Sequence, residues 1–326
     1  MDHVATDPKR GAAGQGTSRR RLREWPAAWL ACLALTLSAG AGGPARAAAS
    51  HAPGTSAAGV LFSLPAPDTR APAPRRLITL APHITELVFA AGAGGRIVGT
   101  VASSDYPPQA RHIPRVGNGI QLDTERIIAL RPDLVLAWQP SGATRALAPL
   151  LARLHIPLAY VQPRALRDIP REITALGNRL DTSAAADREA QALSDRIAAL
   201  GARYQGRHPV STFIEVGTAP LYTLGKAPLI NDVLHVCGGT NIFAGAPIPA
   251  PQVSVESVLQ DRPDAVIIAS TDARRVTERT RYWAGLSLPA ARNHHVYGLD
   301  PDKLFRPGPR LIDAAQALCQ DLARAR

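Results

Sequence analysis

A short pattern that occurs twice constrains the fold of this chain more than any other feature. Residues 124–138 and 255–270 each contain a glutamate, an apolar run with helical spacing, Arg-Pro-Asp and a second short apolar run. In both copies the glutamate precedes the arginine by six residues. Proline cannot continue a helix, aspartate favours the turn that follows, and the second apolar run predicts a strand covered on both faces. The repeat therefore predicts equivalent units in two similar α/β lobes; chance recurrence of a common pattern is the alternative.

Predicted strands and helices alternate along most of the chain. Strands joined by helices at this spacing are typical of parallel sheets covered by helices. Between the two copies, residues 183–204 keep helical apolar spacing over an unusual length. We expect this long helix to join the lobes, although a helix packed within one lobe would show the same pattern. Besides the repeat, the sequence predicts strands at 77–81, 96–101, 157–161, 211–216 and 296–299, and helices at 85–91, 143–154, 166–180, 183–204 and 311–324.

The N-terminus has the outline of a secretory signal. Four arginines at positions 19–23 precede an apolar run at residues 25–37, and Ala45-Arg46-Ala47 offers a small-x-small cleavage site. The run is shorter than the roughly 20 residues that a membrane-spanning helix needs, so a retained anchor is the weaker interpretation. The general and the twin-arginine export routes both stay open. We expect a periplasmic protein from which the signal peptide is removed.

Composition sets the boundaries of the remaining parts. The residues after the signal are rich in Ala, Pro, Ser and Gly and lack apolar periodicity, which is typical of a linker. The predicted organisation is a signal peptide at 1–47, a disordered linker at 48–74, an N-terminal α/β lobe at 75–165, a helical connection at 166–207 and a C-terminal α/β lobe at 208–326.

Charge and motifs argue against several classes of function. The formal net charge is +11 and falls to +7 without residues 1–47, but the arginines are scattered and no nucleic-acid-binding motif accompanies them. The chain has no GxSxG elbow, P-loop or HExxH motif, and its histidines are dispersed. We therefore expect no nucleic-acid partner, no catalytic residues, no catalytic cofactor and no resident metal site.

The cysteines agree with an exported protein. Cys32 lies in the apolar run and would leave with the signal, so Cys237 and Cys319 remain. An even pair in an exported chain predicts a disulfide.

Six segments together resemble one protein family. The chain is similar to the periplasmic substrate-binding proteins of iron-siderophore and cobalamin ABC importers, most closely to the cobalamin-binding members. Each match is weak alone, but their order and both cysteines agree from about residue 76 to the C-terminus. The segments are LITLAPHITELVFAAG at 77–92, SDYPPQA at 104–110, ERIIALRPDLVLAW at 125–138, VCGGTNIF at 236–243, PQVSVE at 251–256 and PRLIDAAQALC at 309–319.

The resemblance implies an architecture and a mode of docking. It implies two α/β lobes with mainly parallel sheets joined by one long helix, a ligand cleft between the lobes, limited hinge motion and a disulfide between Cys237 and Cys319. It also implies one glutamate on each lobe that contacts arginines of the membrane permease, and Glu125 and Glu256 occupy those positions. A solvated glutamate near a helix start, favoured by the helix dipole, is the alternative.

The resemblance is weaker in the cleft. Trp138 and Tyr222 stand at positions where the cobalamin binders have aromatic residues, which suit a flat ring with apolar faces. Ser103, Gly119 and Ala250 stand where those binders have tyrosine, tryptophan and tryptophan. Losing three rings predicts a wider or more polar pocket, so a different corrinoid, haem or a siderophore stays open as ligand.

Two further elements are candidates for ligand contact. The loop of Asp302, Lys303, Leu304, Phe305 and Arg306 corresponds to the family's ligand-contacting loop before the last helix. In it Asp302 would accept hydrogen bonds from ligand amides and Arg306 would hold a phosphate or carboxylate; an internal Asp–Arg pair in a surface loop is the alternative. His83 follows the first strand and could ligate cobalt or iron, although a packed or capping histidine is the more common case.

We therefore expect an exported, monomeric binding protein of an ABC importer. It would capture cobalamin or a related corrinoid as a transported ligand, catalyse no reaction, and deliver the ligand to a permease dimer. A haem- or ferric-siderophore-binding protein of the same importer class is the alternative, and a metal-site protein or hydrolase is a remote one.

Overall fold

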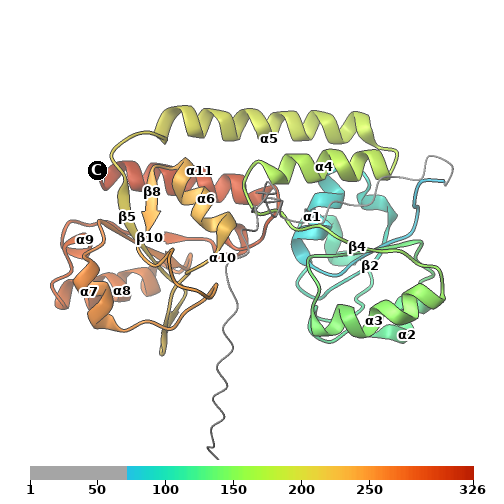
Figure 1. Cartoon of the computed structure of the whole chain (residues 1–326), viewed down its shortest axis with the longest axis horizontal. Helices are drawn as coiled ribbons and strands as arrows, with labels where there is room; N and C mark the ends of the chain where they lie inside the picture. Colours follow the sequence, from blue (N-terminus) through green and yellow to red (C-terminus); the bar gives the residue numbers. More distant parts are fainter. Residues whose placement is uncertain (1–71) are drawn as a thin grey trace, which may run out of the picture. The chain divides into compact units, whose positions relative to one another are not determined.

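The computed structural model describes residues 72–326 (Figure 1). The predicted signal peptide and the predicted linker up to residue 71 lie outside this range. Within it, none of the helices combines the length and apolar character that crossing a membrane requires.

The first lobe is built on a four-stranded parallel sheet. Its strands are β1 (Leu77–Thr79), β2 (Ile97–Thr100), β3 (Leu134–Ala137) and β4 (Leu158–Tyr160), in the order β2-β1-β3-β4. Its helices are α1 (Pro82–Ala90), α2 (Thr124–Ala129), α3 (Gly142–Arg153) and α4 (Asp168–Arg179), with short 3₁₀ turns at Gly94–Arg96 and Pro108–His112. Helix α1 starts three residues earlier than predicted because Pro82 occupies its first turn, where a missing N–H costs nothing.

The second lobe repeats this arrangement. Its parallel strands are β5 (Val210–Glu215), β8 (Gly239–Asn241), β9 (Ala265–Ala269) and β10 (Val296–Leu299), in the order β10-β9-β5-β8, with a small antiparallel hairpin of β6 (Gly217–Thr218) and β7 (Leu221–Tyr222). Its helices are α6 (Pro228–Val236), α7 (Val255–Asp261), α8 (Ala273–Gly285), α9 (Pro289–Arg292), α10 (Pro301–Leu304) and α11 (Arg310–Arg324).

The two sheets have the same topology. In each, the lobe's first strand lies between its second strand and the strand of the sequence repeat, and the last strand lies on the outer side of the repeat strand. The arginine of each repeat adopts a left-handed conformation, with φ of 45° at Arg131 and 46° at Arg262. The residue before a proline is disfavoured in the right-handed helical region, which fits this shared turn. The prediction of two similar α/β lobes is confirmed.

The aspartate of Arg-Pro-Asp accepts hydrogen bonds from backbone N–H groups of the first strand region in both lobes. Asp133 accepts hydrogen bonds from the backbone N–H groups of Arg75 and Arg76 at 2.8 and 2.9 Å. Asp264 accepts one from the backbone N–H of Ser211 at 2.9 Å. Each carboxylate therefore fastens the start of the lobe's first strand to the repeat strand, which is more than the turn-forming role that the sequence suggests.

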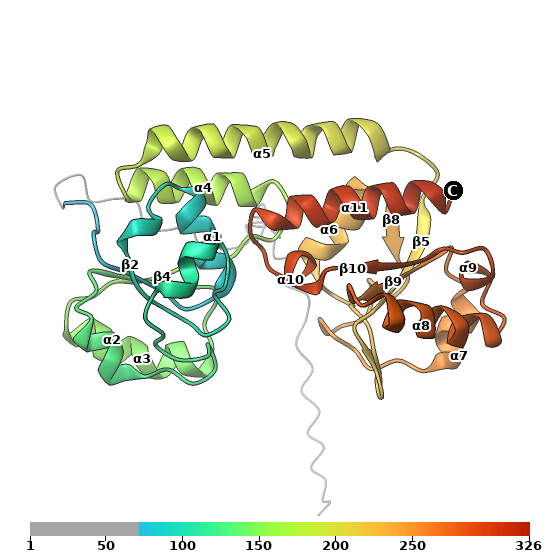
Figure 2. The same cartoon turned by 180° about the vertical axis from the view of Figure 1, so that it is seen from behind.

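Helices cover both faces of each sheet, and one apolar core continues through both lobes. In the second lobe, residues of α6 and α11 pack on one face, and residues of α7, α8 and α9 pack on the other (Figure 2). Trp283 and Phe243 lie in the second of these layers, where both ring systems flank Phe213.

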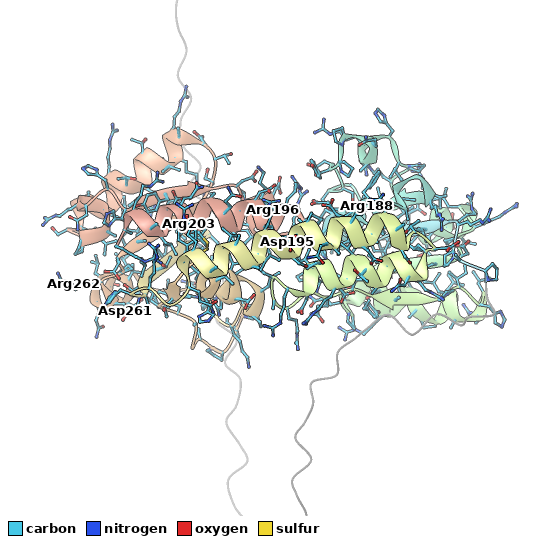
Figure 3. All side chains as sticks on the ribbon, turned by 90° about the horizontal axis from the view of Figure 1, so that it is seen from above. Arg188, Asp195, Arg196, Arg203, Asp261 and Arg262 are labelled. Carbon is cyan, nitrogen blue, oxygen red and sulfur yellow. A yellow bond between two sulfur atoms is a disulfide. The ribbon has the colours of Figure 1, made fainter. Side chains whose placement is uncertain are left out.

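Helix α5 (Ser183–Tyr204) stands between the two sheets in the sequence and has the predicted bounds. It packs against α4 of the first lobe and α11 of the second (Figure 1). A Cβ on Gly177 of α4 would collide with the side chain of Ala186, so glycine is needed for this close approach. Arg196, on the face of α5 seen in Figure 3, forms an ion pair of 2.6 Å with Asp313 of α11.

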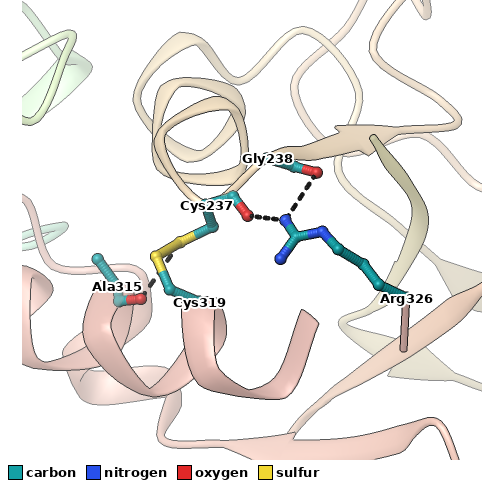
Figure 4. Close-up of a disulfide and its surroundings, with 5 residues drawn as sticks. All are labelled: Cys237, Gly238, Ala315, Cys319 and Arg326. Atoms are coloured by element: carbon teal, nitrogen blue, oxygen red, sulfur yellow. Dashed lines mark hydrogen bonds between the residues drawn. A yellow bond between two sulfur atoms is a disulfide. The ribbon is translucent and has the colours of Figure 1, made fainter. Parts of the chain in front are cut away.

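The predicted disulfide joins Cys237, which follows α6, to Cys319 on α11 (Figure 4). Both residues are fully buried, and Arg326 donates a hydrogen bond of 2.7 Å to the backbone carbonyl of Cys237. A cross-link between residues 82 positions apart stabilises a fold by roughly 4 kcal/mol in the chain-entropy model. The bond therefore anchors the C-terminal helix to the second lobe.

Candidate functional site

The carboxyl ends of β3 and β4 in the first lobe, together with loop residues and the start of α6 in the second lobe, border one cavity. In open parallel α/β sheets this edge is the usual place for a ligand. The cavity has a volume of about 530 Å³, within the range of small-molecule sites. We call it the inter-lobe cavity; its lining is Trp138, Gln139, Gln162, Pro163 and Arg164 from the first lobe, and Lys226, Ala227, Pro228, Leu229, Ile230, Pro247, Pro249 and Phe305 from the second.

Two aromatic rings line the cavity, one from each lobe. Trp138 directly follows β3 and stays part-exposed, and Phe305 directly follows α10. Of the predicted ligand contacts, these are the two that line the cavity. Their rings offer large apolar faces to a flat ligand.

The polar lining was missed by sequence reasoning. The Gln162 side chain donates a 3.1 Å hydrogen bond to Gln139, so the two amides lie side by side. Arg164 and Lys226 add one cation from each lobe, and neither forms an ion pair within residues 72–326. The signal that could have found the first-lobe residues is their position just after strands β3 and β4. Lys226 has no comparable signal, because it precedes a helix.

His83 lies behind Trp138 and outside the lining. The two rings meet edge to face with their centroids 5.4 Å apart, and the imidazole is almost fully buried. Burial, with a contribution from the nearby positive charge of Arg306, lowers the pKa of His83 to about 3. Its Nε2 has no hydrogen-bond partner among the described residues. In this structure the imidazole therefore supports the tryptophan as a neutral ring.

The buried His83 should make stability depend on pH. Its pKa lies well below the ordinary value of 6.5, so the unfolded chain binds a proton that the folded protein does not. His83 therefore does not reduce the free energy of unfolding above about pH 6.5. Its protonation in the unfolded chain reduces that free energy increasingly as the pH falls from 6.5 toward 3. Between pH 6.5 and 5 we expect His83 to account for a loss of roughly 2 kcal/mol in the free energy of unfolding.

Urea titrations of the wild type and of His83→Leu at pH 8, 6.5 and 5 measure this effect. The variant should lose less stability than the wild type between pH 6.5 and 5. Parallel pH profiles would mean that His83 is protonated in the folded protein.

A cluster of five charged residues connects the lobes beside the cavity. Arg310 of α11 donates two hydrogen bonds to Glu86 of α1, at 2.6 and 3.0 Å. Arg306 pairs with Asp105 of the first lobe and with Asp302 of its own loop, both at 2.7 Å. We call these five residues the ion cluster. It ties the first lobe to the start of α11.

The electrostatics of the ion cluster change the role predicted for Arg306. Three carboxylates face two guanidinium groups, so the cluster carries no surplus positive charge. Burial raises the pKa of Glu86, and the hydrogen bonds and charge of Arg310 oppose that rise. Burial raises the pKa of Asp105, but the hydrogen bond and the positive charge of Arg306, with smaller contributions from the backbone and Arg310, together outweigh burial and hold that pKa below its usual value. Arg306 and Asp302 thus form the internal pair that the sequence left open, and in this structure Arg306 is engaged by protein rather than free for an anion.

The remaining predicted contacts do not line the cavity. Leu304 is fully buried in the apolar core, so its prediction as a ligand contact is wrong for this conformation: an aliphatic side chain in that place packs under the loop. Lys303 is half-buried. Ser103, Tyr222 and Ala250 are exposed on the loops and hairpin that follow β2, β5 and β8, and none of the three is part of the lining.

Four buried hydroxyl groups, also missed from sequence, hold the loop after β2. Thr79 and Thr85 donate to or accept from each other at 2.7 Å, and both bond to Thr100. Ser104 joins them through Thr100 at 2.8 Å. This network fixes the loop that carries Ser103 and Asp105 against the carboxyl end of β1.

Glu125 and Glu256 occupy equivalent places on the two lobes. Each is the second residue of its helix, α2 or α7, and both are exposed. The helix ends are already capped, because Asp123 accepts from the backbone of Arg126 and Ser254 accepts from that of Ser257. Both carboxylates are therefore available to a partner.

Within residues 72–326 no three His, Cys, Asp or Glu side chains gather in a way that could hold a metal ion.

A cavity enclosed by two parallel α/β lobes, with rings, amides and cations in its lining, defines a two-lobed ligand-binding protein. The sequence profile of the periplasmic binding protein family matches residues 77–303, and the chain belongs to this family.

Individual relatives are similar over most of the described chain. The vitamin B12-binding protein of Photorhabdus laumondii subsp. laumondii is 39% identical over 250 residues, 77% of this chain and 88% of that protein. The protein of the same name from Pectobacterium carotovorum is 37% identical over 251 residues, 76% of this chain and 88% of that protein.

Solved structures agree with this fold. The crystal structure of the periplasmic vitamin B12 binding protein BtuF of Vibrio cholerae matches with a TM-score of 0.71 and 33% identity, covering 78% of this chain and 98% of that chain. The periplasmic heme-binding protein RhuT from Roseiflexus sp. RS-1 matches with a TM-score of 0.66 and 26% identity, covering 77% and 99%.

Proposed function

We propose that this protein captures cobalamin or a related corrinoid in the inter-lobe cavity and delivers it to the permease of an ABC importer. Membership of the periplasmic binding protein family supports a transport role without catalysis. The names of the relatives at 36–39% identity support a corrinoid as the ligand. The observation that carries the proposal is the lining of the inter-lobe cavity.

The lining complements the chemistry of a corrinoid. A corrin ring has broad apolar faces, which suit the rings of Trp138 and Phe305. Its edge carries amide side chains, and the paired amides of Gln139 and Gln162 can donate to and accept from them. The phosphodiester of a complete cobalamin would be bound by Arg164 and Lys226, which lack partners of their own among the described residues. These polar groups would replace the rings that Ser103, Gly119 and Ala250 do not supply.

Export and delivery complete the proposal. The predicted signal at residues 1–47 would direct the protein to the periplasm. There it would act as a monomer. Glu125 and Glu256 would then dock it on the permease dimer, one glutamate on each subunit. Their equivalent places on two similar lobes suit a partner with two equivalent subunits.

A haem is the second candidate ligand. The two unpaired cations of the cavity, Arg164 and Lys226, would also suit the two carboxylates of a haem, and the similarity to a heme-binding protein supports the same candidate.

Absorbance of the purified protein distinguishes the two ligands. The protein is incubated with cyanocobalamin or with haemin and then desalted. A retained corrin spectrum at a stoichiometry near one supports the proposal. A retained Soret band without corrin binding would replace it with the haem candidate.

Trp138→Ala is expected to weaken cyanocobalamin binding by about 1–3 kcal/mol, which corresponds to roughly 5- to 150-fold in Kd. The reason is the loss of an apolar ring face that lines the cavity. Isothermal titration calorimetry measures the change. Tyr282→Ala removes a part-exposed ring of α8 that does not line the cavity, and should leave Kd within twofold. Equal effects of the two substitutions would contradict a role for Trp138 in the site.

A further inference from the structure

Two isoleucines stand out on the surface. Among the large hydrophobic side chains of residues 72–326, Ile120 is the most exposed at 84% and Ile248 is second at 52%, whereas the next reaches 44%. Single exposed apolar residues are common and need no explanation. These two differ because their places in the fold are equivalent.

Each isoleucine lies in the loop that leads from its lobe's second strand to the repeated helix. Ile120 lies between β2 and α2, and Ile248 lies between β8 and α7. Ile120 precedes Glu125 by five residues and Ile248 precedes Glu256 by eight. Chain segments of these lengths span at most about 18 and 29 Å. Each lobe therefore carries an exposed isoleucine and an exposed glutamate on the same stretch of chain.

Ile120 lies in a tight turn. The Asn118 side chain accepts hydrogen bonds from the backbone N–H groups of Ile120 and Gln121, at 2.9 and 2.7 Å. Gly117 and Leu122 form a bridge at the base of the turn. Gly117 has a φ of 131°, and a Cβ there would collide with the Gln121 carbonyl, so glycine is required. These hydrogen bonds and the bridge therefore fix the backbone that carries the exposed Ile120 side chain.

The backbone around Ile248 is also held by hydrogen bonds. Its carbonyl accepts a hydrogen bond of 3.1 Å from the backbone N–H of Lys226, and the neighbouring Pro249 carbonyl accepts one of 2.9 Å from Gly225. A Cβ on Gly225 would lie 2.5 Å from the Ile248 carbonyl oxygen, so glycine is needed for this approach. Neither Ile248 nor Ile120 lines the inter-lobe cavity.

We propose that Ile120 with Glu125, and Ile248 with Glu256, form two equivalent docking units that seat on the two subunits of the importer's permease. This rests on the proposed function of the glutamates and adds an apolar contact to each of them. Protein interfaces combine a desolvated apolar centre with a charged rim, and the duplication in two similar lobes selects a partner with two equivalent subunits. Each subunit would present an apolar depression beside a basic side chain.

The test measures docking and ligand binding separately. The importer of the source organism is reconstituted in nanodiscs, and the affinity of the ligand-free binding protein for it is measured by surface plasmon resonance. Ile120→Ser and Ile248→Ser should each weaken docking by about tenfold, and the double variant by more. The matched control is Leu154→Ser with Leu286→Ser, which removes one exposed leucine from each lobe and should leave docking within twofold. Calorimetry with cyanocobalamin should give the wild-type Kd for all of these variants.

Each of the following outcomes would overturn the inference. Docking of the double isoleucine variant within twofold of wild type would exclude an apolar contact. A loss of cyanocobalamin affinity with intact docking would assign the isoleucines to ligand binding instead. If charge reversal at Glu125 and Glu256 abolishes docking while the isoleucine variants dock normally, the inference fails and the proposed function stands. If the wild-type protein does not dock on the importer at all, the proposed delivery itself is wrong.

Discussion

Uptake of cobalamin should fall to background when Glu125→Lys and Glu256→Lys are combined, while the Kd of the purified protein for cyanocobalamin stays unchanged. Both carboxylates are exposed, lie outside the lining of the inter-lobe cavity, and are not needed to cap their helices. The hydrogen bonds that Glu256 makes to its own backbone and to Ser254 lower its pKa, which keeps it ionised. If both glutamates dock on basic permease residues as proposed, reversing both charges replaces two attractions with two repulsions. Transport into proteoliposomes containing the importer measures the loss.

A control must match the change in net charge. Glu189→Lys with Glu278→Lys alters two exposed glutamates, one on the connecting helix α5 and one on α8 of the second lobe. This pair should transport at the wild-type rate. If both double variants lose transport equally, the effect belongs to overall charge. If the Glu125 and Glu256 variant loses cyanocobalamin binding, the two glutamates do not act in docking alone.

Arg310→Met should lower the free energy of unfolding by about 3–5 kcal/mol at pH 7, the usual cost of removing one partner from a buried ion pair. Glu86 is almost fully buried and would lose both hydrogen bonds from the guanidinium. Arg310 is also a cause that holds the pKa of Glu86 down, so its removal lets that pKa rise further. The carboxyl then protonates more readily as the pH falls. The deficit relative to wild type should therefore be smaller at pH 5 than at pH 7.

Urea unfolding followed by tryptophan fluorescence measures the deficit. Adding Glu86→Gln to Arg310→Met removes the stranded charge and should restore most of the lost stability. Arg196→Met breaks an exposed pair with Asp313 and should cost no more than about 1 kcal/mol. A loss in Arg310→Met that is no larger than in this control would mean that solvent reaches Glu86.

Much of the fold could be predicted because its signals are local. The long helix α5 and the strand β10 have the predicted bounds, since helical periodicity and a short apolar run are readable in a single segment. The repeat gave the two lobes for the same reason. The short helices α9 and α10 and the hairpin of β6 and β7 are too brief to show a period, and they were missed.

The candidate site was less predictable because its contacts are distant in sequence. Arg310 and Glu86 are 224 positions apart, and Arg306 and Asp105 are 201 apart, so no pattern in one segment pairs them. Arg306 was therefore predicted to bind an anion that the protein's own carboxylates replace in this structure. Arg164 and Lys226 are far apart in sequence and line the same cavity only in the folded protein. Leu304 is the last residue of helix α10, and a helix of four residues is too short for the sequence to reveal which side chain is buried.

The unbroken helix α5 has a consequence for unloading. It carries the chain from one half of the protein to the other, packs tightly on α4 and α11, and is supplemented by the buried link between Glu86 and Arg310. We expect that two lobes joined in this way do not open spontaneously to release the ligand. If the protein delivers its ligand to an ABC importer as proposed, we expect part of the energy of ATP hydrolysis to be used to separate the two lobes.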